Sequence, residues 1–492
     1  MNDQALYERS TTPDDASGFD FTDLEDSRIS TGSPGADIVL NGGFLSNTIN
    51  LIIGQPGSGK TIFSQQMMYG NAPGLRGLYV STLSEPQGKV VRFVQKMSFF
   101  RRELLRESVS YHSVGDLLRE HGATKMPVLV ADLIEKFRPN LLVIDSFKAV
   151  RDLSNEPPQL RRMMHELASL LTSLEITSFL VGEYGEDHYE FAPEFTVADS
   201  IVELLRRKRG LMDERFFRVH KFRGSDYHAG MHATSISGDG LHVYPRLVTP
   251  PEPQAYKPTD GRVPTGVPGL DDLVGGGFWR GSTSLVMGTT GAGKTSLGLQ
   301  FILEGLRRDE SVLYVNFQEN PIELQRHFDS ILGEEILSAE QLASLHLIYK
   351  FPIEMHIDSI VSDIMEAVTR DGVRRVVIDA IDDLEQVAES TRRLQDFLFS
   401  ISETFMLHQV TTVFTLEGSF EELHSQGGFP FRVSQLSDTL ITLTNDVRKP
   451  GRRRLLRVVK SRNSEHTEDA HPITLNQSGV SVASPPAPTE PA

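Results

Sequence analysis

The sequence predicts the α/β fold class, with two tandem domains that each contain a mainly parallel sheet flanked by helices. Three observations predict it. One long segment occurs twice, short aliphatic or β-branched runs alternate with longer helical patterns, and a glycine-rich loop joins a strand to a helix at the same place in both copies. Such alternation is typical of parallel strands joined by crossover helices. We therefore expect two copies of one fold, although a length of 492 residues alone would suggest about three domains.

The internal repeat extends over nearly the whole chain. Four pairs of residues are each separated by 234 positions: Arg28 and Arg262, Lys60 and Lys294, Glu85 and Glu319, Asp145 and Asp379. The separation is 239 for two later pairs: Asp199 and Asp438, Lys221 and Lys460. The second copy therefore gains a net five residues in its later part, and the repeat is a tandem duplication of one domain.

The repeat also sets the expected domain boundaries. We expect a disordered tail over 1–27, a first domain over 28–248, a linker over 249–261, a second domain over 262–482 and a disordered tail over 483–492. The first tail is acidic and polar without apolar periodicity, and the linker and the second tail are rich in proline. Segments of this composition do not bury enough apolar surface to fold.

Composition excludes several classes of function. The chain has 49 Lys and Arg against 66 Asp and Glu, a net charge of −17, and such a field repels nucleic acids and anionic membranes. The lack of cysteine excludes disulfides, thiolate zinc sites, iron–sulfur clusters and cysteine nucleophiles. The first residues do not resemble a secretory signal, and no apolar run approaches the ~18 residues of a membrane span. We therefore expect a cytoplasmic protein without a membrane segment.

The glycine-rich loops match the pattern G-x-x-x-x-G-K-[ST] of the P-loop. Each follows an expected strand (49–54 or 283–288) and precedes an expected helix (62–70 or 296–305), which is the context that the motif requires. Backbone N–H groups of such a loop surround phosphate oxygens, and the helix N-terminus adds a positive dipole. The expected nucleotide-binding residues are Gly54, Gly57, Ser58, Gly59, Lys60, Thr61, Gly288, Gly291, Ala292, Gly293, Lys294 and Thr295. The sequence therefore predicts that both copies bind ATP or GTP.

Acidic residues and the loop threonines predict the metal and the catalytic positions. Asp145 and Asp379 end buried aliphatic runs, where a carboxylate would join Thr61 and Thr295 in holding Mg²⁺. Hydrolysis also needs a carboxylate that orients or deprotonates water. The candidates are Glu85 in STLSEP and Glu319 in NFQENP; a solvated glutamate at a strand end is the alternative for each.

The segments upstream of both loops, RISTGSPGAD…NGGF and RVPTGVPGLDDLVGGGF, resemble the KaiC family, the two-domain RecA-like ATPases of the cyanobacterial clock. The resemblance covers roughly residues 28–482. It implies tandem RecA-like P-loop domains and a hexamer in the form of a double ring, with ATP between neighbouring subunits. The family's Lys and Arg, supplied by a neighbour to the γ-phosphate, match Lys221 and Arg223 in the first copy and Lys460 and Arg462 in the second. Cations from a neighbour would neutralise charge in the transition state.

The catalytic position departs from the family's pattern. The family carries two consecutive glutamates, whereas this chain has Ser84-Glu85 and Gln318-Glu319. If the first position holds the general base, both rings hydrolyse ATP slowly. If the second position suffices, hydrolysis is retained, and the sequence does not decide between these readings.

The phosphorylation site departs as well. The family's phosphorylated Ser-Thr pair aligns with Ser434-Gln435, and an earlier Thr aligns with Phe429. Only Ser434 keeps a hydroxyl, so an ordered two-site cycle is excluded and single-site autophosphorylation of Ser434 by a weak serine kinase activity is left open. The expected function is a KaiC-like signalling or regulatory ATPase that uses Mg²⁺ and ATP, assembles with itself and acts through protein partners.

Two dense basic runs leave open an alternative function, that of a DNA-dependent recombinase or helicase. RRKRG (206–210) and RKPGRRR (448–454) occupy matching places in the two copies, and RecA-like rings include DNA-dependent recombinases and helicases. The other interpretation is that each run is the exposed tip of a hairpin. The net charge and the lack of interleaved aromatic residues favour the hairpins. The 15 histidines show no metal-binding spacing.

Overall fold

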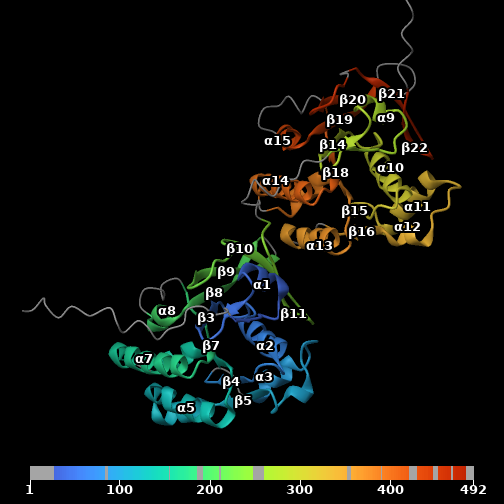
Figure 1. Ribbon diagram of the computed structural model, residues 1–492. Helices are drawn as coiled ribbons and strands as arrows, with labels where there is room; N and C mark the ends of the chain where they lie inside the picture. Colours follow the sequence, from blue (N-terminus) through green and yellow to red (C-terminus); the bar gives the residue numbers. More distant parts are fainter. Residues whose placement is uncertain are drawn as a thin grey trace, which may run out of the picture. The chain divides into compact units, whose positions relative to one another are not determined.

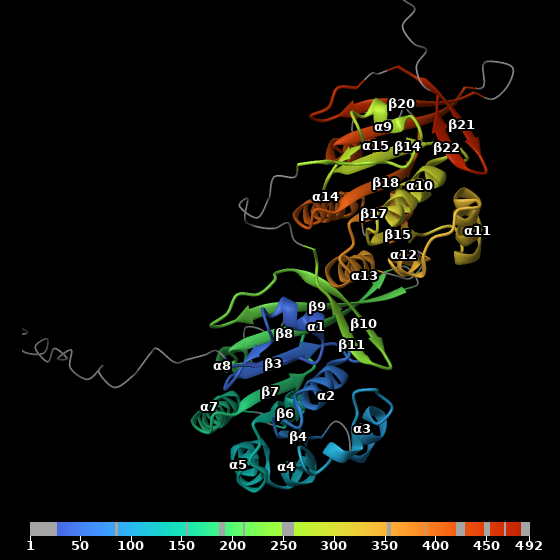
Figure 2. The same cartoon turned by 45° about the vertical axis from the view of Figure 1, so that its right-hand side comes forward.

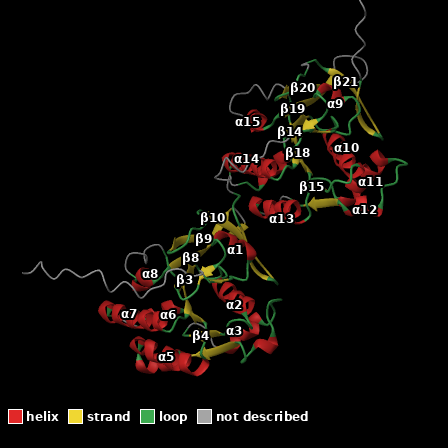
Figure 3. Cartoon of the chain, viewed as in Figure 1, coloured by secondary structure: helices red, strands yellow, loops and turns green. Residues whose placement is uncertain are grey.

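The computed structural model describes residues 27–83, 87–153, 156–185, 192–209, 212–247, 260–351, 356–388, 390–419, 429–446, 453–466 and 469–483. The chain divides into two compact units, unit 1 (Met1–Pro245) and unit 2 (Arg246–Ala492). Each unit has a large sheet with helices packed on it (Figures 1 and 3). The predicted tails and linker lie almost entirely outside the described residues, so the predicted domain boundaries stay predictions.

Unit 1 alternates strands and helices through most of its length. Its strands are β1 (Arg28–Ile29), β2 (Phe44–Leu45), β3 (Ile49–Gly54), β4 (Gly77–Ser81), β5 (Val109–Ser113), β6 (Leu141–Asp145), β7 (Thr177–Gly182), β8 (Ser200–Arg209), β9 (Met212–Phe222), β10 (Met231–Ser237) and β11 (Gly240–Tyr244). Its helices are α1 (Pro34–Val39), α2 (Lys60–Asn71), α3 (Gln87–Val94), η2 (Arg102–Leu104), α4 (Gly115–His121), η3 (Ala123–Lys125), α5 (Met126–Phe137), α6 (Phe147–Arg151), α7 (Pro157–Ser173) and α8 (Pro193–Val197), where η marks a 3-10 helix.

Unit 2 repeats this order. Its strands are β12 (Arg262–Val263), β13 (Phe278–Trp279), β14 (Thr283–Gly288), β15 (Val312–Asn316), β16 (Leu345–Tyr349), β17 (Arg375–Asp379), β18 (Thr411–Glu417), β19 (Thr439–Asp446), β20 (Arg453–Ser461), β21 (His471–Asn476) and β22 (Gly479–Val482). Its helices are α9 (Leu270–Leu273), α10 (Lys294–Arg307), α11 (Pro321–Leu332), α12 (Ala339–Ala343), α13 (Ile357–Arg370), η6 (Ile381–Gln386), α14 (Thr391–Leu407) and α15 (Phe429–Leu436).

The two large sheets have the same topology. Within the described residues each sheet has nine strands, in the orders β11-β10-β9-β8-β3-β7-β6-β4-β5 and β16-β15-β17-β18-β14-β19-β20-β21-β22. The six strands from β8 to β5 run parallel, as do the six from β16 to β19. The remaining three strands of each sheet are antiparallel. The predicted fold class, two tandem and mainly parallel α/β domains, is confirmed.

Helices cover both faces of each sheet, so its central strands are buried on both sides. Along β3, Ile52 packs with α2 and α3, whereas Leu51 and Ile53 pack with α5 and α7. This alternation follows from the two-residue repeat of a strand. Figure 2 shows these two pairs of helices on opposite faces of the sheet. In unit 2, Val286 of β14 packs with α10 and α11, and its neighbours pack with α13 and α14.

The basic runs lie at hairpins. Arg209 pairs with Met212 where the antiparallel β8–β9 ladder ends, and Arg206 forms an ion pair with Asp213, with 2.5 Å between Nη2 and Oδ2. The hairpin interpretation is therefore confirmed for unit 1. In unit 2 the run 448–454 joins the antiparallel strands β19 and β20 and lies mostly outside the described residues.

No helix in the described part of the chain is both long enough and apolar enough to span a bilayer.

Candidate functional site

Each glycine-rich loop lies where a central strand ends and a helix begins. β3 ends at Gly54 and α2 begins at Lys60, while β14 ends at Gly288 and α10 begins at Lys294. β3 lies between β7 and β8, so the loop lies where the order of strands reverses, the usual ligand position in such sheets. Gly59 has φ of 103°, a left-handed conformation that favours glycine. The loop and the helix N-terminus together offer backbone N–H groups to an anion.

The loop lysines are held by carbonyl oxygens of their own loops. Lys60 Nζ donates to two of them at 2.8 and 2.9 Å, and Lys294 Nζ donates to the carbonyl oxygen of Gly288 at 2.7 Å. Lys60 is only 8% exposed, and burial lowers its pKa although Glu183 and Asp145 oppose the shift. A buried ammonium group of this kind gains strongly from an added anion.

The surroundings of Lys60 fit a nucleotide phosphate. Among the described residues, the carboxylate atom closest to Lys60 Nζ is Glu183 Oε1 at 3.9 Å, beyond a direct hydrogen bond. Ser58 Oγ, in the same loop, is buried and has no hydrogen-bond partner among the described residues, and an unpaired buried hydroxyl is costly. A cavity of about 860 Å³ opens beside the loop, lined among others by Thr61 and Asp145, and ligand pockets have this size.

The structure brings together the residues that the sequence assigns to Mg²⁺. Thr61 Oγ1 donates to Asp145 Oδ2 at 2.8 Å, and Thr295 Oγ1 donates to Asp379 Oδ2 at the same distance. A hydroxyl and a carboxylate in contact at the start of a P-loop helix are the donor set that this cation prefers. The residues present therefore fit Mg²⁺ in both units.

Two tyrosines also contact these aspartates, and sequence reasoning missed them. Tyr79 donates to Asp145 Oδ2 at 2.7 Å, and Tyr314 donates to Asp379 Oδ2 at 2.6 Å. Burial, together with the neighbouring carboxylate, raises the pKa of both phenols, so they stay hydrogen-bond donors. The repeated LYV segments contained the signal, but only the strand pairing shows which side chain each tyrosine meets.

The predicted catalytic glutamates are not equivalent in the two units. Glu85 lies outside the described residues, and Glu319 follows β15 by three residues. In the sheets, Ser81 and Asn316 occupy the same position, each paired with the aspartate that ends the neighbouring strand. Counting on from them, Glu319 corresponds to Ser84 rather than to Glu85. The predicted correspondence of Glu85 with Glu319 is therefore wrong by one residue, because unit 2 has one more residue between the loop lysine and this strand.

The four predicted interface cations lie at the end of each sheet that is remote from the loop. Lys221 Nζ donates to the carbonyl oxygen of Ala198, just before β8, at 2.5 Å, and Arg223 lies 3.6 Å from Asp199. In unit 2, Lys460 Nζ donates to the carbonyl oxygen of a residue just before β19 at 2.6 Å. The loop lies at the other end of these parallel strands. Within one unit, these cations and the loop are therefore not brought together.

The cations of unit 2 repeat this arrangement in detail. Arg462 Nη1 lies 3.6 Å from Asp438 Oδ1, and its side chain is 53% exposed. Burial lowers the pKa of Lys221 and of Lys460, and the neighbouring arginine lowers it further. Each pair therefore presents one anchored ammonium group and one accessible guanidinium group.

Ser434, the candidate phosphoacceptor, lies in α15 shortly before β19. Its carbonyl oxygen accepts a hydrogen bond from Lys460 Nζ at 3.2 Å. Ser434 is thus on the same end of the unit 2 sheet as Lys460 and is remote from the loop that contains Lys294.

Comparison with known proteins identifies the family. A family model described as "ATPase: KaiC" matches residues 29–248 and, a second time, residues 263–487. The chain belongs to the KaiC ATPase family. A circadian clock oscillator protein KaiC from Picosynechococcus sp. is 26% identical over 476 residues, which cover 92% of this chain and 89% of that protein. Circadian clock protein KaiC3 from Synechocystis sp. is 25% identical over 481 residues, which cover 93% and 92%.

Membership of the KaiC family confirms the resemblance that the sequence showed. It agrees with the observed pair of RecA-like domains and indicates that nucleotide binding and ATPase activity are properties of this chain's family. The roles of individual residues, the assembly and any phosphorylation are matters of proposal.

Proposed function

We propose that this protein is a KaiC-like signalling or regulatory ATPase that hydrolyses ATP at the subunit interfaces of a hexameric double ring. The observation that carries the proposal is the repeated contact between loop threonine and strand-end aspartate, Thr61 with Asp145 and Thr295 with Asp379. The same two contacts occur beside loop lysines that are held by carbonyl oxygens of their own loops. Family membership supports the reaction.

In this proposal, different residues of the chain bind the phosphates, hold Mg²⁺ and activate the water. Lys60 and Lys294 would hold the β- and γ-phosphates, and Mg²⁺, when bound at the threonine and aspartate, would neutralise charge on the phosphate oxygens. Glu319 would orient the attacking water and accept its proton. For Glu85 the same role stays a prediction.

The position of the cations supports hydrolysis between subunits. Arg223 and Arg462 lie at the far end of the sheet from the loop of their own unit, so each fits a role at the loop of another copy. A head-to-tail contact of this kind closes into a ring when the rotation between copies closes. The γ-phosphate would then lie between a loop and a neighbour's guanidinium, which stabilises the transition state.

Nucleotide should therefore promote assembly. With saturating Mg²⁺–ATP, light scattering should give the mass of a closed ring, expected as six chains, because a ligand held by two subunits stabilises their contact. The double variant Lys60→Ala, Lys294→Ala is the control and should not respond to nucleotide. A wild-type monomer at saturating Mg²⁺–ATP contradicts the proposal.

One experiment tests the reaction itself. Purified protein is incubated with Mg²⁺ and γ-labelled ATP, and both free phosphate and label retained on the protein are measured. Free phosphate above the level of the double lysine variant supports the ATPase. If DNA stimulates the reaction and this stimulation falls steeply with salt, the protein is instead a DNA-dependent motor. The acidic charge and the hairpin contacts of the basic run 206–210 argue against that outcome.

We further propose that Ser434 is the only phosphoacceptor of the segment 425–440. Transfer would join the γ-phosphorus of ATP to Ser434 Oγ, release ADP and move the hydroxyl proton to Glu319 of a neighbouring subunit. After prolonged incubation with Mg²⁺–ATP, mass spectrometry should find at most one phosphate per chain. It should be absent in Ser434→Ala, and two or more phosphates in this segment would contradict the proposal.

The physiological output of such an ATPase would pass through protein partners. The two relatives described above carry names that place them in the circadian clock. We propose a related regulatory role here, without the ordered two-site phosphorylation, because Gln435 and Phe429 have no hydroxyl.

A further inference from the structure

The backbone around Glu319 is fixed by one buried side chain. Asn316, at the end of β15, is only 2% exposed. Its Oδ1 accepts hydrogen bonds from the N–H groups of Gln318 at 3.0 Å and Glu319 at 3.2 Å. Its Nδ2 donates to the carbonyl oxygen of Glu319 at 2.6 Å. Three hydrogen bonds from one amide therefore set the position of the turn that presents the carboxylate.

A second contact holds Gln318, the residue before Glu319 in this turn. Gln318 Nε2 donates to Asp383 Oδ1 at 2.9 Å, and Asp383 is in η6, shortly after the strand that ends at Asp379. Asp383 is 8% exposed, and its Oδ2 has no hydrogen-bond partner among the described residues. The contact connects the turn that contains Glu319 with the element that follows the metal-binding strand.

The side chain of Glu319 is 37% exposed, and one of its carboxylate oxygens is unpaired among the described residues. Glu319 Oε2 is buried and has no hydrogen-bond partner within the described part of the chain. His327 Nδ1 lies 3.9 Å from this oxygen. The other ring nitrogen of His327 is 3.0 Å from Ser296 Oγ, next to the loop threonine on α10. A carboxylate held on a fixed turn with an unused oxygen is the arrangement that a general base for water needs.

Unit 1 has the same loop, but its described residues do not form these anchors. The sheet register places Ser81 at the position of Asn316, and Ser81 Oγ instead contacts the carbonyl oxygen of His112 at 3.4 Å. Ala149 follows Asp145 at the same distance as Asp383 follows Asp379, so unit 1 has alanine at the position of Asp383. In the same way, Ile62 after Lys60 is at the position of Ser296 after Lys294. Counted along the sequence from Ser81 and Asn316, Leu83 is at the position of Gln318 and Ser84, which is outside the described residues, is at the position of Glu319.

We infer that the two nucleotide sites are unequal: unit 2 hydrolyses ATP, with Asn316 and Asp383 as positioning residues for Glu319, whereas unit 1 binds ATP and retains it. This inference rests on the proposed function, and it replaces the catalytic role predicted there for Glu85 in unit 1. The loop, its lysine and the threonine–aspartate contact are the same in both units, so binding is common to both. The residues that differ are those that position Glu319, the proposed base for the attacking water, so the difference concerns hydrolysis.

Glu319→Gln tests which unit carries the reaction, because glutamine keeps the size of the side chain and removes its basicity. A general base contributes roughly 10²–10⁴-fold. If unit 2 is the hydrolytic unit, the variant should retain less than about a tenth of the wild-type phosphate release while still binding two nucleotides per chain. Retention of about half would show that unit 1 hydrolyses ATP equally well and would overturn the inference.

The nucleotides that stay bound give a second readout. After incubation with Mg²⁺–ATP and rapid removal of free nucleotide, wild-type protein should hold ATP and ADP in similar amounts, and Glu319→Gln should hold ATP alone. ADP in both units of the wild type would overturn the inference. If the wild type releases no phosphate and holds ATP alone, the proposed ATPase fails instead, so the two failures are distinguishable.

Asp383 is tested by a pair of variants. Asp383→Ala, which installs the residue of unit 1, should lower kcat by about tenfold or more with little change in KM, because ATP binding does not use Asp383. Asp383→Asn keeps an oxygen that accepts from Gln318 and should restore most of kcat. If Asp383→Asn is as slow as Asp383→Ala, Asp383 is not a positioning residue. If Asp383→Ala is as fast as the wild type, its contact with Gln318 has no part in catalysis.

Discussion

Replacement of Arg462 with alanine is expected to slow ATP hydrolysis by roughly 10³-fold or more, the usual effect of removing a guanidinium that stabilises phosphoryl transfer. Arg462 directly follows β20, at the end of the unit 2 sheet that is remote from Lys294. It forms one loose ion pair with Asp438 at 3.6 Å and donates to the carbonyl oxygen of Gln435 at 3.1 Å. These are weak, exposed contacts, so the fold should survive the change while phosphate release falls.

Mixing two inactive chains shows whether Arg462 acts on another subunit. Arg462→Ala chains keep an intact loop, and Lys294→Ala chains keep an intact arginine. In rings assembled at random from equal amounts, about a quarter of the interfaces combine the two intact parts. Activity should therefore return to about a quarter of the wild-type rate. Arg370→Ala, at an exposed ion pair on α13, is the matched control and should be fully active. No recovery on mixing would contradict catalysis between subunits.

The P-loops could be predicted from the sequence because their requirements are local. A glycine at position 59 is needed for a left-handed backbone, and the lysine and threonine that follow begin the helix. The aspartates Asp145 and Asp379 could also be found, since each ends a short aliphatic run that is long enough for a buried strand. Parallel strands then bring loop and aspartate to the same edge of the sheet.

The register between the two copies near Glu319 was misassigned in the sequence analysis. Lys60 and Lys294 are 234 residues apart, but the equivalent strand positions Ser81 and Asn316 are 235 apart. The extra residue lies in the region where α10, with 14 residues, is longer than α2, with 12. Helix ends and loops tolerate such insertions, and the pairing of Glu85 with Glu319 at a spacing of 234 concealed the extra residue. The LYV segments at 78–80 and 313–315 are 235 residues apart, and the hydrogen-bonded ladder, in which a shift by one residue reverses every side chain, agrees with this register.

The contacts around Glu319 were beyond sequence reasoning for a different reason. Asp383 of η6 accepts a hydrogen bond from Gln318, and His327 of α11 lies 3.9 Å from Glu319; their spacing in the chain matches no known motif. In unit 1 the corresponding positions hold Ala149 and Arg92. Such contacts depend on how separate elements pack, so their residues become visible as a group only in the fold.

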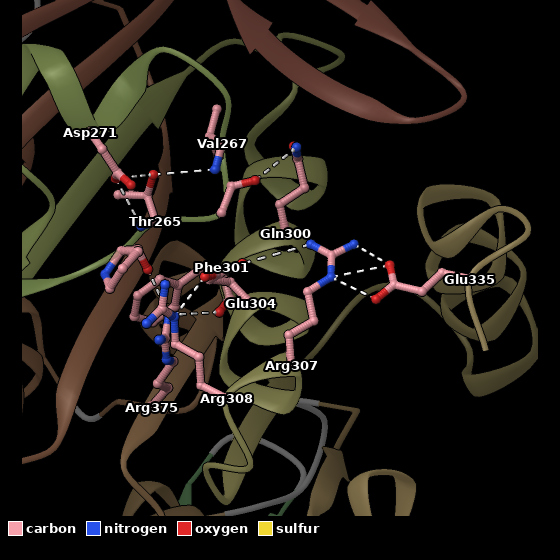
Figure 4. A network of polar contacts seen from close by, with 12 residues as sticks. Thr265, Val267, Asp271, Gln300, Phe301, Glu304, Arg307, Arg308, Glu335 and Arg375 are labelled. Carbon is pink, nitrogen blue, oxygen red and sulfur yellow. Dashed lines mark hydrogen bonds and ion pairs between the residues drawn. The ribbon is translucent and has the colours of Figure 1, made fainter. Parts of the chain in front are cut away.

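A buried ion pair in unit 2 leads to the largest expected effect on stability. Arg375 of β17 is fully buried, and its Nε donates to Glu310 Oε2 at 2.5 Å while Nη1 donates to the carbonyl oxygen of Pro264 at 2.7 Å. Figure 4 shows its guanidinium group beside Phe301, with 4.8 Å between Cζ and the ring centroid. Burial lowers the pKa of Arg375, and Glu310 opposes the shift. The guanidinium stays charged, and Glu310 compensates this buried charge.

Glu310→Ala should consequently destabilise unit 2 by about 3–5 kcal/mol, because removal of one partner leaves a buried charge without compensation. Trp279 of β13 is the single tryptophan of the sequence, so its fluorescence during urea unfolding reports on unit 2. Glu335→Ala removes the half-exposed partner of Arg307, also drawn in Figure 4, and should cost at most about 1 kcal/mol.

A compensating change separates loss of the pair from loss of packing. Unit 1 has Leu141 at the position of Arg375, at the same place in its sheet, so this position of the fold accepts an aliphatic side chain. If the cost of Glu310→Ala comes from the uncompensated charge, adding Arg375→Leu should recover most of it, since apolar replacements of buried ion pairs are often neutral. If the double variant is as unstable as Glu310→Ala, the loss comes from the packing of Glu310 itself. The charge pair would then be a feature that unit 2 tolerates, and not one on which its stability depends.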